Sequence, residues 1–189
     1  MTKNNSQILC ETKFLQLKQA LSPNNHPWFY AHRQHSQGVV MIVPLISNPE
    51  GDEIVFLETR RPPIYAEGKA NTCIELPAGL VGDENCDETF LEAARKELLE
   101  ETGYVAESIE ICAQNCSSSP GATSETFSVA IAQIVDKTIH TEHLTTDGGI
   151  ILERHLIKRI DARKWLKEQM EQGKSVSAQT YTGLFMIEK

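Results

Sequence analysis

The chain has 189 residues, 40% of them hydrophobic, and a formal net charge of −8. This length suits one medium-sized domain with a real core and room for a small appendage. The acidic balance argues against a nucleic-acid or anionic-membrane surface, because such surfaces need clustered lysine and arginine, and no apolar run approaches the ~20 residues of a membrane span.

The first segment predicts a small antiparallel β unit. Apolar residues alternate loosely over residues 8–20, a turn rich in proline and asparagine covers 22–27, and residues 28–33 form a short aromatic strand. We assign residues 1–36 to this unit, which is too small to be stable alone.

Residues 37–189 predict a second domain of the α/β (α+β) class. The near-continuous apolar run at 39–46 indicates a strand buried on both faces, and a turn joins it to a strand at 53–58 as a hairpin. Strands flanked by helices imply a mixed β-sheet sandwiched between helices. The further expected strands lie at 72–76, 107–113, 126–135 and 155–160, and the further helices at 161–172 and 177–187.

A helix follows the loop that begins at Gly82. Asn85 with Glu88 three residues later resembles a capping box, so we expect the helix to start near residue 86. Gly103 supplies the left-handed position that ends it. An apolar stripe that would dock on the sheet consists of Phe90, Leu91, Ala94 and Leu98.

Three carboxylates lie at the edge of that stripe. Glu97 and Glu101 are stacked one turn apart on the helix, with Glu100 alongside. Like charges at this spacing repel by a few tenths of a kcal/mol, so we expect a hard cation between them. The alternative is an ordinary surface helix in which Glu92 and Lys96 form an ion pair four residues apart.

Residues 82–104 resemble the signature box of the Nudix hydrolases. The matching positions are Gly82, Glu88, Glu97, Leu98, Glu100, Glu101, Gly103 and Tyr104. Lys96 stands where the family usually has arginine, which keeps the charge but loses the planar bidentate geometry. The resemblance implies a Nudix fold and hydrolysis of the pyrophosphate bond in substituted nucleoside diphosphates.

The same resemblance implies the metal site. Glu97, Glu100 and Glu101 would bind Mg²⁺ or Mn²⁺, with the carbonyl of Ala78 as a further ligand, and Glu97 and Glu101 would be catalytic. Carboxylate and carbonyl oxygens are the ligands that hard cations prefer. Bound cations also let an acidic protein accept an acidic substrate.

A general base should activate the attacking water. In the similar enzymes it is a glutamate on a late loop, which here corresponds to Glu153 after the segment 145–149, while Asp147 and Glu142 are alternatives. Glu153 could equally be a plain surface residue at the start of a strand.

Features outside the box resemble one branch of the family, the pyrophosphatases of ADP-ribose and other nucleoside diphosphate sugars. Arg60 and Arg61 before two prolines are similar to its phosphate-binding turn, for which a bidentate arginine is suited. Pro120 lies sixteen residues beyond Tyr104, as in that branch, and Glu125 ends a similar run. These residues are candidate substrate contacts.

The branch also implies a homodimer with swapped N-terminal strands and an aromatic residue stacked on the nucleobase. Trp28 is the candidate, although the aromatic residues of 28–30 could instead fill the core of their own unit. The expected partner is a small nucleotide sugar: ADP-ribose, with GDP-mannose or UDP-sugars as alternatives. A non-catalytic nucleotide-binding module is a further alternative, disfavoured because every box glutamate is present.

The five cysteines indicate a reducing compartment. They are scattered and odd in number, and the first residues lack the layout of a secretory signal. We therefore expect reduced thiols and a cytoplasmic protein.

Overall fold

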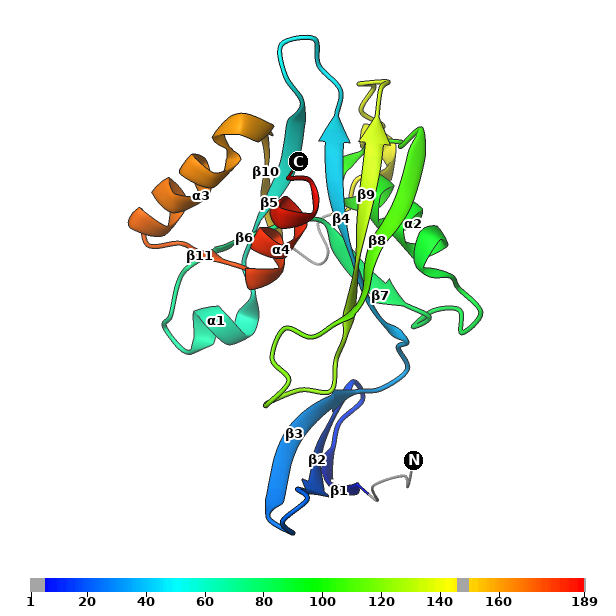
Figure 1. The fold of residues 1–189 in the computed structure, drawn as a ribbon, viewed down its shortest axis with the longest axis vertical. Helices are drawn as coiled ribbons and strands as arrows, with labels where there is room; N and C mark the ends of the chain where they lie inside the picture. The colour runs from blue at the N-terminus through cyan, green and yellow to red at the C-terminus, as the bar shows by residue number, and fades with distance from the viewer. Residues whose placement is uncertain (1–5, 146–149, 189) are drawn as a thin grey trace.

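A computed structural model describes residues 6–145 and 150–188 of the chain. Its described part is a mixed sheet with helices on both faces, below which lies a separate small sheet (Figure 1). The elements in chain order are β1 (Gln7–Glu11), β2 (Leu15–Leu21), β3 (Pro27–Arg33), β4 (Gly38–Ile46), β5 (Glu53–Thr59), α1 (Pro62–Ala66), β6 (Cys73–Glu75), β7 (Ala78–Val81), α2 (Phe90–Thr102), β8 (Ser108–Cys116), β9 (Phe127–Ile134), the 3₁₀ turn η1 (Thr141–His143), β10 (Ile151–Lys158), the 3₁₀ turn η3 (Arg159–Asp161), α3 (Ala162–Glu171), β11 (Ser175–Val176) and α4 (Ala178–Met186).

The large sheet is built around β4. This strand runs parallel to β9 and antiparallel to β5 and β7, and the order along the sheet is β11-β6-β5-β4-β9-β8, with β10 added beside β5. β4 has the apolar run predicted for a doubly buried strand, and all but one of its residues are buried. The predicted mixed sheet is confirmed.

Alternate residues of β4 enter two different cores. Val40 and Ile42 pack with Ala94 and Leu98 of α2 on one face. On the other face Met41 and Val43 belong to the core that includes residues of α3 and α4. The helices therefore sandwich the sheet, as expected (Figure 1). The predicted apolar stripe of α2 is only partly right: Phe90, Ala94 and Leu98 pack on the core, whereas Leu91 is 42% exposed and Ala93 is buried instead.

The N-terminal strands form the predicted antiparallel sheet in the order β1-β2-β3. β3 is tied to the loop after β8, because the backbone N–H of Ala31 donates to Ala122 O and that of Ser124 donates to Ala31 O. Trp28 and Phe29 are each 54% exposed, so they do not fill a core of this sheet. The division at residue 36 stays a prediction.

Helix α2 begins later than predicted. Thr89 is its N-cap and forms a capping box with Glu92, whereas the predicted pair was Asn85 with Glu88. The reason lies in the loop, where Asn85 Oδ1 accepts from the N–H of Asp87 and Glu88 Oε2 accepts from the N–H of Gly82. The expected end is confirmed, since Gly103 has a φ of 77°.

Candidate active site

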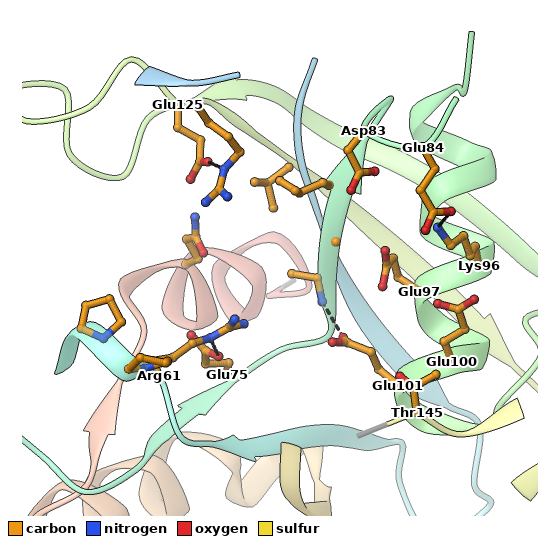
Figure 2. A pocket seen from close by; sticks show the side chains of 18 residues that line it. Arg61, Glu75, Asp83, Glu84, Lys96, Glu97, Glu100, Glu101, Glu125 and Thr145 are labelled. Carbon is orange, nitrogen blue, oxygen red and sulfur yellow. Dashed lines mark hydrogen bonds and ion pairs between the residues drawn. The ribbon is translucent and has the colours of Figure 1, made fainter. Parts of the chain in front are cut away.

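A cavity of about 660 Å³ is lined by residues of α2 and β7 and, facing them, by residues of α1, β6 and the first turn of α4. The carboxyl groups of α2 lie on one side of it, and Glu125 and the pair Arg61–Glu75 lie on the other (Figure 2). A cavity of this size suits a ligand as large as a dinucleotide or nucleotide sugar. Its charged lining residues are Arg33, Arg61, Glu75, Asp83, Glu84, Lys96, Glu97, Glu100, Glu101 and Glu125.

The three glutamates predicted from the helix spacing all reach this cavity. Glu101 is buried, with 7% of its surface exposed, and its Oε2 accepts a hydrogen bond of 2.9 Å from the backbone N–H of Ala78 (Figure 2). Glu97 lies directly over Gly79, where an added Cβ would come within 2.0 Å of the carboxyl carbon. The start of β7 therefore fixes the positions of two of the three carboxylates.

The donor set fits a hard divalent cation. Glu97, Glu100, Glu101 and Ala78 line one cavity, so carboxylate oxygens gather beside a backbone carbonyl. Mg²⁺ and Mn²⁺ prefer such oxygen ligands, and no sulfur or imidazole ligand that would favour a softer metal is present in this described lining.

A second group of possible metal ligands lies on β5 and β10. The ligand atoms of Glu58, Glu153 and His155 lie within 4.8 Å of one another. Lys174 Nζ donates to Glu58 Oε2 over 2.6 Å, and His155 Nε2 lies 3.2 Å from the same oxygen. Because an ammonium already sits at this carboxylate, the glutamates of α2 fit a metal better.

The cations of the cavity are all held by ion pairs to acidic neighbours. Arg33 Nε lies 2.5 Å from Glu125 Oε2, and Arg61 Nε lies 2.7 Å from Glu75 Oε2. Lys96 Nζ lies 2.8 Å from Glu84 Oε2. Positive charge in this lining is thus balanced locally.

Lys96 does not form the helical ion pair considered as the plain surface alternative. Glu92 instead accepts from the backbone N–H of Thr89 in the helix cap. Lys96 forms a hydrogen bond to Glu84 that raises the pKa of the lysine, and the charges of Glu97 and Glu100 add to this effect. The lysine is therefore a positive neighbour of the carboxylate cluster, held on its outer side.

Four of the predicted site residues lie outside the cavity lining. Arg60 stacks its guanidinium over the ring of Tyr65, 5.4 Å from the centroid. Trp28 Nε1 donates to Gly121 O at 2.8 Å, beside exposed Pro120. Glu153 is exposed on β10, where its Oε1 lies 3.8 Å from His155 Nδ1. Their roles in binding or catalysis stay predictions.

The two alternative candidates for the general base are Glu142 and Asp147. Glu142 is exposed in η1, where its Oε1 lies 3.3 Å from His140 Nδ1. Asp147 lies outside the described residues. The identity of the general base stays a prediction.

Several lining or supporting residues were not predicted from the sequence, and three of them come from segments remote from the signature box. Arg33 reaches the cavity from the end of β3, and Gln179 from the first turn of α4. Arg154 on β10 donates from Nε to Glu101 O at 2.5 Å and from Nη2 to Thr145 O at 2.8 Å. A positive side chain at the C-terminal end of α2 also complements the helix dipole.

The signals for these residues were weak. Arg33 and Arg154 are single arginines on strands with no motif around them, and Gln179 stands in an unremarkable helical segment. Only the pairing of distant strands and the docking of α4 bring them to the site.

Comparison with protein families gives one match over most of the chain. A family model described as "NUDIX domain" matches residues 36–171. Among curated proteins, the ADP-ribose pyrophosphatases of Escherichia coli strain K12 and of Shigella flexneri are each 26% identical over 121 residues. The aligned part covers 64% of this chain but only 56% of each of those relatives.

Two solved structures share the fold. A structure titled as an ADP compounds hydrolase has a TM-score of 0.67 at 18% identity, and covers 97% of this chain and 89% of its own. The NUDIX domain of Shewanella oneidensis NrtR complexed with ADP ribose has a TM-score of 0.55 at 14% identity, with coverages of 87% and 90%. At these identities the likeness concerns the fold alone.

No helix in the described part of the chain has the length and apolar character needed to cross a membrane.

Proposed function

The chain belongs to the NUDIX family, whose domain covers residues 36–171, and we propose that it hydrolyses the pyrophosphate bond of ADP-ribose or a related nucleoside diphosphate sugar with Mg²⁺. The products would be a nucleoside monophosphate and a sugar phosphate. The observation that carries the proposal is that Glu97, Glu100 and Glu101 share a cavity with the pair Arg61–Glu75, which faces them.

Four groups of the chain would hold the cation, or its equivalent Mn²⁺: the carboxylates of Glu97, Glu100 and Glu101 and the carbonyl of Ala78. Such a cation, when bound, neutralises charge on the leaving phosphate and lowers the pKa of the attacking water. The protein itself fixes the positions of the carboxylates that would bind the cation. The N–H of Ala78 holds the carboxylate of Glu101, and Gly79 leaves room for that of Glu97.

Arg61 would bind the diphosphate from the opposite side. Glu75 accepts from Arg61 Nε and so orients the planar guanidinium at the cavity wall before a phosphate binds. Arg33, oriented by Glu125, is a second candidate for such a contact. We keep Glu153 as the proposed general base.

Two further findings support the choice of substrate. The curated relatives are named ADP-ribose pyrophosphatases, and one solved relative holds ADP ribose. In this chain, the residues that resemble that branch and also line the cavity are Arg61 and Glu125.

We also propose that the protein is a homodimer that uses its N-terminal strands. Leu15, Leu17 and Leu21 share one face of β2, and the β2–β3 register adds Phe29 to the same face. These four side chains are between 44% and 54% exposed. A contiguous apolar surface of this kind favours burial against a second copy.

The test is turnover of a panel of nucleotide sugars by Glu101→Gln. Wild-type protein with Mg²⁺ should release AMP and ribose 5-phosphate from ADP-ribose, and the variant should lose at least ~100-fold in rate, because it loses a charged ligand. Glu171→Gln on the exposed side of α3 is the matched control and should be unaffected.

Three results would revise the proposal. Wild-type turnover by Glu101→Gln contradicts the metal assignment. Faster cleavage of GDP-mannose or a UDP-sugar than of ADP-ribose would change the assigned substrate but keep the assigned reaction. Tight binding of ADP-ribose in calorimetry without any product after long incubation identifies a non-catalytic binding module.

A further inference from the structure

The wall of the cavity that α4 provides contains one uncharged polar side chain, Gln179. Its backbone N–H bonds to Ser177 Oγ at 3.3 Å in the helix cap. The side-chain amide has no hydrogen-bond partner among residues 6–145 and 150–188. An amide of this kind at a cavity wall is available to a ligand.

Close packing fixes the position of α4. The N–H of Ser177 donates to Ile74 O at 3.0 Å, and the fully buried Thr180 lies against the same carbonyl. At Gly183 an added Cβ would come within 2.5 Å of Leu76 and 3.0 Å of Val43, so the helix sits directly on the sheet. The backbone of Gln179 is therefore held in place before any ligand arrives, which lowers the entropy cost of using its side chain.

The charge around this wall is balanced. Glu75, which pairs with Arg61, follows Ile74 directly, and the pair Arg33–Glu125 lies in the same lining. The surplus of negative charge is at the α2 side, where Asp83, Glu97, Glu100 and Glu101 lie. A cation-bound diphosphate belongs at the α2 side, and an uncharged group belongs at the α4 side.

A glutamine matches an uncharged group that carries hydroxyls. Its amide offers two donors and one acceptor oxygen, which is the complement of a pair of neighbouring hydroxyl groups. Arg33 and Arg61, which are proposed to contact the diphosphate, are the arginines of this described lining, so a further phosphate at this wall would have to compete for them.

We propose that Gln179 is a specificity-determining residue that hydrogen-bonds the sugar hydroxyls of the substrate, so that the cavity selects nucleoside diphosphates whose second half is an uncharged sugar. This inference rests on the proposed function and deepens it.

The test compares two substrates in Gln179→Leu, which keeps the volume and removes the amide. One substrate is ADP-ribose. The other is the β-methyl ester of ADP, which keeps adenosine and the pyrophosphate but has no second sugar. We expect kcat/KM for ADP-ribose to fall about tenfold, the effect of two lost hydrogen bonds between uncharged groups, and kcat/KM for the methyl ester to stay unchanged. Gln172→Leu, at the exposed end of α3, is the matched control.

The ratio of the two kcat/KM values decides the outcome. An equal loss on both substrates overturns the proposal, because a purely structural role predicts that result. The proposal is equally overturned if the wild-type protein does not distinguish the two compounds. If wild-type protein cleaves neither, the proposed function fails on its own, and the ratio of the two dissociation constants from calorimetry with Mg²⁺ then tests Gln179.

Discussion

Gly79 shows how one missing side chain makes room for a proposed metal ligand. Its place in β7 is covered by Glu97, and an added Cβ would lie 2.0 Å from atoms of that carboxyl group. Gly79→Ala should therefore displace Glu97 and weaken Mg²⁺ binding about tenfold, an effect typical of a disturbed metal environment. Calorimetric titration with Mg²⁺ measures it.

Gly121→Ala is the control for this substitution, because the nearest atom to its Cβ would be Trp28 Cζ2 at 3.8 Å, an ordinary contact. Unchanged Mg²⁺ affinity in Gly79→Ala would mean that Glu97 is not a ligand, or that another position of its side chain serves as well.

Glu58 is a buried carboxylate whose charge depends on Lys174. Burial raises the pKa of Glu58, but hydrogen bonds from Lys174, Thr72 and His155 outweigh it and hold the pKa below its usual value. Lys174→Met should lower the free energy of unfolding at pH 7 by about 1–3 kcal/mol, because it leaves a buried charge without its ionic partner.

The pH dependence follows from the direction of that shift. A carboxyl group with a lowered folded-state pKa stabilises the protein above its unfolded-state pKa and loses this contribution as the pH falls through the folded-state value. The difference between Lys174→Met and wild type should therefore be full at pH 7 and begin to shrink as the pH falls below about 4, the range of an ordinary glutamate. Urea unfolding at several pH values measures it, with the exposed Lys167→Met as control. A difference that is as large at pH 3 as at pH 7 would contradict the role of Glu58.

The predictability of the site depends on how each residue reaches it. Glu97, Glu100 and Glu101 share one helix, so their spacing alone predicts their convergence. Arg33 and Gln179 come from opposite ends of the chain, and no local pattern relates them to α2. The positions of Arg33 and Gln179 depend on long-range strand pairing and on the packing of α4 against the sheet.

At the level of elements, α2 shows how two equivalent signals compete. Asn85 with Glu88 and Thr89 with Glu92 both have the spacing of a capping box, and the second pair forms it. Glu88 is used elsewhere, because its carboxylate accepts from Gly82 at the start of the loop. Sequence spacing cannot rank the two pairs, since the loop contact depends on β7.

Substitutions at the two caps separate these interpretations. Thr89→Ala should reduce the free energy of unfolding by about 1 kcal/mol, because it removes the acceptor for the N–H of Glu92. Asn85→Ala should change it by no more than ~0.5 kcal/mol, because Asn85 lies in an exposed turn ahead of the helix. Urea unfolding of both variants measures this, and the reverse order would place the helix start near residue 86.

The short elements were the least predictable. β7 has four residues and pairs with β4 from Gly38 to Met41, and α1 has five residues that follow Arg61. Neither is long enough to show a period of its own, so the pairing with β4 and the proline pair at the start of α1 define them. Both border the cavity, which is why the site is less predictable than the fold.

At the scale of the whole molecule, the N-terminal sheet would connect the proposed dimer interface with the cavity. Arg33 lies on the same face of β3 as Phe29, by the register with β2, and it also lines the cavity. A second copy that covers this apolar face would therefore border the substrate. The proposed dimer and the proposed activity are coupled through this strand.

Leu17→Glu tests the dimer. The wild-type protein should have a mass near twice 21.1 kDa by light scattering, and Leu17→Glu should halve it, because a charge would enter the apolar interface. Lys18→Glu, on the opposite face of β2, is the control and should remain dimeric. A monomeric wild-type protein would contradict the proposal.

The local balance of charge in the cavity also determines the order in which cation and substrate can bind. Its three cations are each held by a carboxylate, and the lining carries four further acidic side chains: Asp83, Glu97, Glu100 and Glu101. A diphosphate that reached this lining before any cation would be repelled by like charge. Turnover should therefore follow a fixed sequence, with cation entry first and substrate entry second, and excess nucleotide in solution should slow the protein by withdrawing the cation that must precede it.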